Sequence, residues 1–407
     1  MKKKPKISIR GNLAPYSPIR KLSPYAEEAK SRGTTVFHLN IGQPDFKVPE
    51  TIQEEIRKHG DIDFLPYAGS QGSKELIDSW QKYYKDINVE VSCDEIIITY
   101  GASEALIFAM ATVCDPQEEL IVFEPFYANY NGFANLVSAK IKSIPLDIAH
   151  GYHLPPKDEI IKKITNKTKA ICIINPNNPT GTVFNENELL SIIEIAHKYN
   201  LFIIADETYY GICFDGVKMK SILQVTDNST RERIIVVDSV SKRLNVCGAR
   251  VGAIVSPNKE VISAVMRFAQ ERLAVATIEQ EIVASELKDS LPYVKNITAD
   301  YQKRRDVLIK TLEQELDILI HKPEGAFYIM LKLPFLGAEK FAKWLLEKYS
   351  FNKQTVMVAP GSGFYNTPSL GDDEIRLAYV LKPKELKNAA IILARAIKEY
   401  QESVIDK

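Results

Sequence analysis

A lysine stands at the exit of an apolar segment, where a solvated lysine is not expected. Lys242 follows RIIVVDSVS, which predicts a buried strand and the turn after it. Desolvation and a nearby cation both disfavour an ammonium group, so such an amine loses its proton easily and can form a Schiff base with an aldehyde. Arg250 comes eight positions later, where it could hold a phosphate with the hydroxyls of Ser239 and Ser241.

Two more ionisable residues come from segments that predict buried strands. Asp206 ends the apolar run in LFIIADE, and a buried carboxylate is costly unless a cation or hydrogen-bond donors meet it. Arg376 lies inside the apolar segment EIRLAYV, where an unpaired guanidinium is costly as well. Asp206 could keep a pyridine nitrogen protonated, and Arg376 could bind a substrate carboxylate through two parallel hydrogen bonds.

A turn of small residues adds a possible phosphate site. Gly101, Ala102 and Ser103 lead from an apolar run into a helix-like segment, and the N–H groups at a helix N-terminus bind anions well. An ordinary helix cap explains Ser103 about as often as anion binding does. Taken together, the amine, the carboxylate, the two guanidinium groups and this turn fit one cofactor, pyridoxal 5′-phosphate.

The segments that must position these residues form a regular series. Apolar, strand-like runs occur at 95–100, 119–125, 140–146, 169–176, 201–207, 233–239 and 251–257. Helix-like segments such as 103–113 and 186–200 lie between them. This alternation predicts an α/β fold, three layers deep, with a mostly parallel seven-stranded sheet. Ligands bind at the carboxyl ends of the strands in such sheets, which is where these residues fall.

The rest of the chain predicts a second, smaller unit. Residues 270–315 predict long charged helices, and 326–333 and 375–381 predict strands of an α+β domain. The first 45 residues carry no strong core pattern. We expect an N-terminal segment (1–47) that packs with the small domain, a large cofactor-binding domain (48–290) and a small C-terminal domain (291–407).

Composition excludes several other classes of protein. The 52 basic and 52 acidic residues balance, which argues against nucleic acid or an anionic membrane as the main partner. The one charge run, MKKKPK at residues 1–6, is expected to be a solvated terminus. With no signal peptide and no long apolar window, a soluble, cytoplasmic protein is expected. Five scattered cysteines and six histidines without ligand spacing predict neither a disulfide framework nor a metal site.

Eight segments, in order, resemble the fold-type I, class I and II aminotransferases of the aspartate aminotransferase superfamily over essentially the whole chain. They are LNIGQPDF (39–46), YAGSQGSKEL (67–76), YGASEAL (100–106), NPNNPTG (175–181), DETY (206–209), SVSKRLNVCGARVG (239–252), PEGAFY (323–328) and EIRLAY (374–379). The resemblance implies transamination between an L-amino acid and a 2-oxo acid in two half-reactions. Aspartate and 2-oxoglutarate are the first expectation for this pair.

The resemblance also implies roles around the cofactor ring. Lys242 would carry pyridoxal 5′-phosphate and move the substrate proton, and Asp206 would pair with the ring nitrogen. Tyr209 and Asn178 would hydrogen-bond the phenolic oxygen. Tyr127 would stack on the ring.

Further roles concern the phosphate and the substrate. The residues implied around the phosphate are Gly101, Ala102, Ser103, Ser239, Ser241 and Arg250. Tyr67 would reach the phosphate of the neighbouring subunit, so that a homodimer would have its active sites at the subunit interface. The substrate α-carboxylate would be bound by Arg376 and Asn178 with the backbone of Gly42.

The match departs from the family in places that bear on substrate choice. Ala249 stands where many relatives carry a tryptophan, and Ser103 stands where one acid-specific branch carries a lysine. Arg243, Arg267 and Arg272 are candidates for binding a distal carboxylate, but nothing in the sequence selects one of them. Alanine, aromatic amino acids and specialised biosynthetic substrates therefore stay open.

Other activities are open on the same fold. A lyase, decarboxylase or oxidase could use Lys242, Asp206 and Arg376 as well, although the local motifs favour transamination. A regulator with an aminotransferase-like ligand domain would need a DNA-binding domain, for which the roughly 45 residues before the large domain leave too little room. A P-loop nucleotide enzyme is excluded because no G-x-x-x-x-G-K-[ST] segment occurs.

Overall fold

The computed structural model describes residues 5–405 and is built around a seven-stranded sheet of order β2-β8-β7-β6-β5-β3-β4. The strands are β2 (Ile96–Thr99), β3 (Glu119–Glu124), β4 (Lys140–Pro145), β5 (Thr168–Ile174), β6 (Phe202–Asp206), β7 (Ile234–Ser239) and β8 (Gly252–Val255). All pairs from β7 to β4 are parallel, and only β8 runs antiparallel to its neighbours β7 and β2. The predicted α/β fold with a mostly parallel sheet is confirmed.

Alternate residues of the central strands pack into two different cores. In β5, Ile171 and Ile173 belong to one buried cluster, whereas Ala170, Cys172 and Ile174 belong to another on the opposite face. Successive side chains of a strand point to opposite faces of a sheet, so a strand that is apolar throughout needs cover on both sides. The sheet is therefore the middle of three layers.

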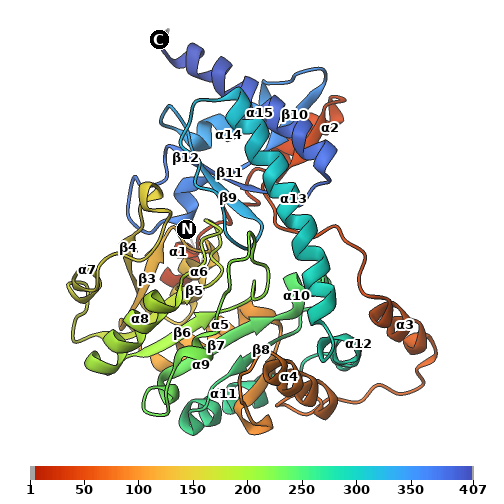
Figure 1. Ribbon diagram of the computed structural model, residues 1–407, viewed down its shortest axis with the longest axis vertical. Helices are drawn as coiled ribbons and strands as arrows, with labels where there is room; N and C mark the ends of the chain where they lie inside the picture. The colour runs from red at the N-terminus through yellow and green to blue at the C-terminus, as the bar shows by residue number, and fades with distance from the viewer. Residues whose placement is uncertain (1–4, 406–407) are drawn as a thin grey trace.

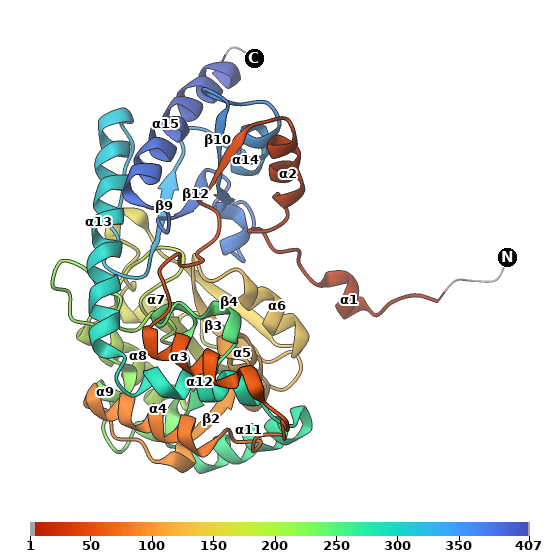
Figure 2. The ribbon, with the colours of Figure 1, turned by 90° about the vertical axis from the view of Figure 1, so that its right-hand side faces the viewer.

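Helices supply the two outer layers (Figures 1 and 2). One face packs against α4 (Lys74–Asp86), α8 (Glu186–Tyr199), α9 (Ile222–Val225) and α12 (Thr277–Leu287). The other packs against α5 (Gly101–Val113), α6 (Asn129–Leu136) and α11 (Lys259–Arg272). The helices predicted at 103–113 and 186–200 are confirmed as α5 and α8.

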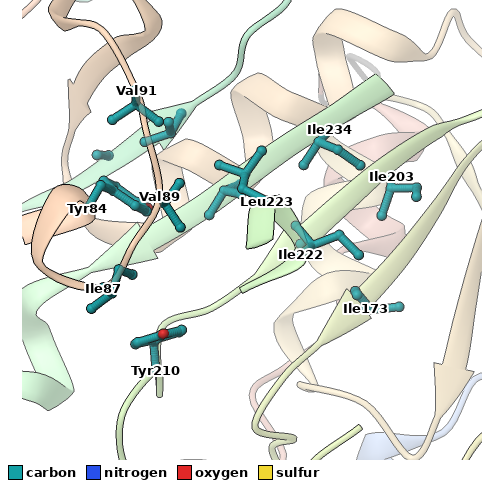
Figure 3. Packing of buried hydrophobic residues seen from close by; sticks show 14 of the residues in the cluster. Tyr84, Ile87, Val89, Val91, Ile173, Ile203, Tyr210, Ile222, Leu223 and Ile234 are labelled. Carbon is teal, nitrogen blue, oxygen red and sulfur yellow. The ribbon is translucent and has the colours of Figure 1, made fainter. Parts of the chain in front are cut away.

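Figure 3 shows how the first of these cores is filled. Ile173, Ile203 and Ile234 come from the neighbouring strands β5, β6 and β7, and Ile222 and Leu223 come from α9. All five side chains are almost fully buried. The packing fixes the strands at their centres, so the polar residues that end these strands have defined positions.

A second unit is built from sequence-distant segments. An antiparallel sheet has the order β11 (Ala359–Pro360), β12 (Glu374–Ala378), β9 (Tyr328–Lys332), and β1 (Thr35–His38) pairs in parallel with β10 (Gln354–Met357). Its helices are α2 (Ser23–Ser31), α14 (Ala338–Glu347) and α15 (Pro383–Ile405), and α13 (Leu291–Glu315) runs from this unit to the large sheet's helices (Figures 1 and 2). The domain boundaries at 48 and 291 stay a prediction.

The remaining α-helices lie in segments that precede or connect these elements. Short helices are α1 (Ile9–Leu13), α3 (Glu50–Lys58), α7 (Lys157–Ile161) and α10 (Val240–Arg243). Figure 2 shows α1 at the edge of the protein near α6, where Arg10 Nη2 donates a hydrogen bond of 2.7 Å to Ser138 Oγ. Of the charge run at residues 1–6, the first four lie outside the described residues. Within residues 5–405, no helix is both long and apolar enough to cross a membrane.

Candidate active site

A cavity of about 630 Å³ opens where β5, β6 and β7 end. Its floor includes the last residues of these strands, Ile174, Asp206 and Ser239. Opposite this floor, the three-stranded sheet of the second unit contributes Tyr328 from β9 and Arg376 from β12. The sequence-predicted residues that line it are Gly42, Ala102, Ser103, Tyr127, Asn178, Asp206, Tyr209, Ser239, Ser241, Lys242, Arg250 and Arg376. The expected position at the carboxyl ends of parallel strands is thus observed.

Lys242 reaches the cavity because a helical turn begins directly after β7. Ser239 ends the strand and caps α10, accepting a hydrogen bond of 3.2 Å from the Ser241 N–H through its hydroxyl. The Lys242 Nζ then donates to the carbonyl of Gly42 at 2.7 Å and lies 3.7 Å from the Cys247 Sγ. Lys242 is half-buried rather than buried, which corrects the expectation from its apolar approach, because its side chain extends into the open cavity.

Asp206 is a buried carboxylate that lacks a cationic partner within residues 5–405. One of its oxygens accepts from the Thr208 hydroxyl at 2.6 Å, and the other accepts from the Tyr130 hydroxyl at 3.2 Å. Burial raises the pKa of Asp206, and the hydrogen bonds from Thr208 and Tyr130 oppose that shift. A protonated ring nitrogen in the cavity would supply the missing positive charge.

A chain of hydrogen bonds links the other polar side chains of the cavity. Asn178 donates through Nδ2 to the Tyr209 hydroxyl at 3.3 Å and accepts through Oδ1 from Arg376 Nη1 at 3.2 Å. The hydroxyls of Tyr209 and Tyr328 lie 2.9 Å apart. Burial raises the pKa of Tyr209 well above its ordinary value, so its hydroxyl stays protonated at neutral pH and can donate to an anionic oxygen.

Arg376 is held by aromatic rings, and no carboxylate of residues 5–405 pairs with it. It lies in the middle of β12, is 1% exposed, and has its guanidinium 4.5 Å from the centre of the Tyr328 ring and 4.8 Å from that of Phe364. Its Nη2 donates to the carbonyl of Asn40, whereas its Nε has no partner within residues 5–405. Burial lowers the pKa of Arg376. A ligand carboxylate would offset this desolvation.

The other end of the cavity can hold an anion. Arg250 has the left-handed φ of 55° and donates through Nη1 to the carbonyl of Cys247 at 2.9 Å. Gly101, which starts the 13-residue helix α5, packs so closely that a methyl group there would lie 2.6 Å from Arg250 Nη2. The helix N-terminus, the guanidinium and the hydroxyls of Ser239 and Ser241 fit a phosphate.

Two sequence-predicted residues do not line this cavity. Gly101 is not part of the lining, and its lack of a side chain leaves room for the Arg250 guanidinium. Tyr67 is 82% exposed and belongs to a segment outside the cavity, so any role would require a second subunit.

The three arginines considered for a distal carboxylate lie elsewhere as well. Arg243 is buried against Asp238, with its guanidinium 4.3 Å from the centre of the Tyr83 ring. Arg272 pairs with Glu104 at 3.5 Å, and Arg267 is on α11 with a hydrogen bond to Ser263. None of the three lines the cavity.

Some residues of the site were missed by the sequence analysis. Tyr328 is part of the quoted segment PEGAFY but was given no role, and Tyr130 follows Tyr127 by three positions, at the start of α6. Cys247 is part of the quoted segment SVSKRLNVCGARVG and was given no role either, and the segment from Ser17 to Arg20 was not predicted to reach the site. Only folding brings that segment to the cavity.

Comparisons with known proteins agree with this geometry. The family model described as aminotransferase class I and II matches residues 34–393. The chain is 30% identical over 401 residues to an aspartate aminotransferase of Pyrococcus horikoshii, which covers 97% of this chain and 98% of that protein. It is 33% identical over 366 residues to a probable aspartate aminotransferase of Methanocaldococcus jannaschii, covering 88% and 92%. The solved structure of an alanine aminotransferase from Pyrococcus furiosus superposes with a TM-score of 0.88 at 29% identity, covering 97% of this chain and all of that one.

Proposed function

The chain belongs to the class I and II aminotransferases, and from this premise we propose that it uses pyridoxal 5′-phosphate to transfer an amino group from an acidic L-amino acid to a 2-oxo acid. Aspartate is the proposed donor and 2-oxoglutarate the proposed acceptor. The observation that carries the proposal is the meeting in one cavity of a lysine amine, a buried carboxylate without a cation, and two separate guanidinium groups.

These residues fit the cofactor by charge and position. Asp206 would meet the ring nitrogen, Arg250 and the turn at Ala102 would meet the phosphate, and Tyr209 would donate to the phenolic oxygen. When bound, the cofactor supplies an aldehyde that condenses with amines and a ring that withdraws electrons from the substrate Cα. Tyr127 lines the cavity, where it would cover one face of the ring.

The protein's own side chains would bind the substrate and move its proton. Arg376 and Asn178 would hold the α-carboxylate, which orients the Cα–H bond in the cavity. The amine of Lys242 would remove the Cα proton and return it to a neighbouring carbon. Such acid–base catalysis contributes about 10²- to 10⁴-fold. The Gly42 carbonyl, 2.7 Å from Nζ, would hold this amine between transfers.

A homodimer is part of the proposal. The segment around Tyr67 exposes large apolar side chains, among them Phe64 at 80% and Leu65 at 55%, which a second subunit would cover. In such a dimer Tyr67 would be free to reach the partner's phosphate. A cytoplasmic location stays a prediction.

The test is a single-turnover assay with the cofactor-loaded protein, one amino acid at a time and no acceptor. An aminotransferase should release one 2-oxo acid per active site and no ammonia, because the amino group stays on the enzyme until an acceptor arrives. Repeated turnover with release of ammonia would instead establish a lyase or oxidase. Failure of aspartate, glutamate, alanine and phenylalanine alike would contradict the proposal.

The two guanidinium groups should be separable by mutation. Arg250→Ala is expected to weaken cofactor binding about 10- to 100-fold, the range for losing hydrogen bonds to a charged group. Arg376→Leu should leave cofactor binding near wild type and raise KM for the amino acid by a similar factor of about 10 to 100. Titrating the apoprotein with pyridoxal 5′-phosphate and measuring steady-state kinetics would separate the two effects. If both variants lost affinity for the same ligand, this division of roles would be wrong.

A further inference from the structure

Four cationic side chains line the cavity, and one of them has no assigned ligand. Lys242, Arg250 and Arg376 each donate hydrogen bonds inside the protein and have proposed roles. Arg20 also lines the cavity, yet its guanidinium makes no hydrogen bond or ion pair with any of residues 5–405, and the residue is exposed. Among the described residues, Asp206 is the one acidic residue of the lining, and it lies in the buried floor.

The backbone that carries Arg20 is fixed. The N–H groups of Arg20 and Lys21 both donate to the carbonyl of Ser17, at 3.2 Å and 3.0 Å, which closes a turn. Lys21 pairs with Glu339 on α14 at 2.6 Å, and Leu22 is buried in the core of the small unit. The guanidinium is therefore the free end of a side chain on an ordered turn, so binding a ligand requires ordering of the side chain alone.

This turn is coupled to the residue that would bind the α-carboxylate. The Asn40 side chain donates through Nδ2 to the carbonyl of Ile19 at 3.0 Å, while the Asn40 carbonyl accepts from Arg376. One residue thus joins the Arg20 turn to Arg376. The guanidinium groups of Arg20 and Arg376 therefore line the same cavity, and the hydrogen bonds of Asn40 connect the segments that carry them.

We propose that Arg20 binds the side-chain carboxylate of the substrate and so selects dicarboxylic amino acids and 2-oxo acids; this rests on the proposed transamination. A planar guanidinium matches a carboxylate in two parallel hydrogen bonds. Among the described residues, no acidic side chain pairs with Arg20, so its guanidinium is available to a ligand. The other three candidates, Arg243, Arg267 and Arg272, lie outside the cavity. The proposed site for the side-chain carboxylate would then be formed by residues of one chain.

The test compares Arg20→Leu with Arg267→Leu, an arginine that lies on α11 outside the cavity. With Arg20→Leu, kcat/KM for aspartate and glutamate should fall about 10- to 100-fold, whereas the values for alanine and phenylalanine should stay within about twofold. Arg20→Lys should recover part of the loss, since it keeps the charge and not the planar fork. Arg267→Leu should leave all four values unchanged.

A binding measurement gives a second readout. Calorimetric titration of the cofactor-loaded protein with succinate, a dicarboxylate, and butyrate, its monocarboxylate counterpart, should show weaker succinate binding in Arg20→Leu and unchanged butyrate binding. Equal losses for all donors, or an unchanged preference for aspartate, would overturn the role of Arg20 while transamination stood. If the wild-type protein transaminated none of the four donors, the proposed function itself would fail.

Discussion

Replacing Lys242 by alanine is expected to lower the transamination rate by about 10⁴-fold or more, because both the positioned base and the amine that holds the aldehyde are lost. The fold should survive the change. Lys242 is half-buried, and its Nζ makes one hydrogen bond, to the Gly42 carbonyl, apart from a contact to the Cys247 Sγ. Arg250, Asp206 and Arg376 keep their positions in this variant, so pyridoxal 5′-phosphate should still bind.

Three measurements check this expectation. Single-turnover assays give the rate, titration with pyridoxal 5′-phosphate gives cofactor affinity, and thermal melting reports the fold. Added methylamine should restore part of the rate, since a small amine fits the space left by the lysine side chain. Cys247→Ser is a matched control, because it changes the other side chain beside Nζ and should leave the rate within about tenfold of wild type. A rate near wild type in Lys242→Ala would refute the role given to Lys242.

The large sheet could be predicted from sequence because its strands carry their own signal. Strands such as β5 and β7 are covered on both faces, so they appear as uninterrupted apolar runs that end at polar residues. The strands β1, β10 and β11 were missed. They have four, four and two residues, and β1 is stabilised by pairing with β10, which lies more than 300 positions away in the chain. No local pattern contains such a pairing.

The same distinction explains which site residues were found. Asp206 and Arg376 interrupt or end an apolar run, so the cost of burying them marks them in the sequence, and Lys242 stands out because it directly follows such a run. Arg20 sits in the polar segment SPIRKLS, where an arginine is unremarkable by itself. Arg20 lies at the cavity because a hydrogen bond from the Asn40 side chain to the Ile19 carbonyl helps to position its turn, and this hydrogen bond exists only in the folded chain.

Asp206→Asn should separate activity from stability. The ring nitrogen would lose its buried counter-charge, and breaking a buried ion pair costs about 3–5 kcal/mol, so the transamination rate should fall about 10²- to 10⁴-fold. The apoprotein should not lose stability. Burial raises the pKa of Asp206 above its ordinary value of 3.8, which means that the folded chain holds this proton more tightly than the unfolded chain. The ionised carboxylate therefore opposes folding.

The pH dependence of the free energy of unfolding follows from this upward shift in the pKa of Asp206. The destabilisation of the folded chain by the ionised Asp206 carboxylate is absent below pH 3.8. It grows as the pH rises toward the raised pKa of Asp206 and is constant above that pKa. At pH 7 the free energy of unfolding of the Asp206→Asn apoprotein should equal or exceed that of wild type, and the difference should shrink as the pH approaches 4. Denaturant unfolding of both apoproteins at several pH values measures it.

Asp238→Asn is the matched control for this stability effect. Asp238 is buried like Asp206, and burial raises its pKa as well, but its carboxylate pairs with the buried Arg243, which opposes that shift. The Nε and Nη1 of Arg243 already lack partners within residues 5–405, so this guanidinium depends on Asp238 for its charge compensation. Removing its charge leaves that guanidinium buried and uncompensated, so the apoprotein should lose about 3–5 kcal/mol. A loss of similar size in Asp206→Asn would show that the Asp206 carboxylate stabilises the fold without the cofactor. Asp206 would then be a structural residue, and the case for a buried charge kept for the cofactor would fail.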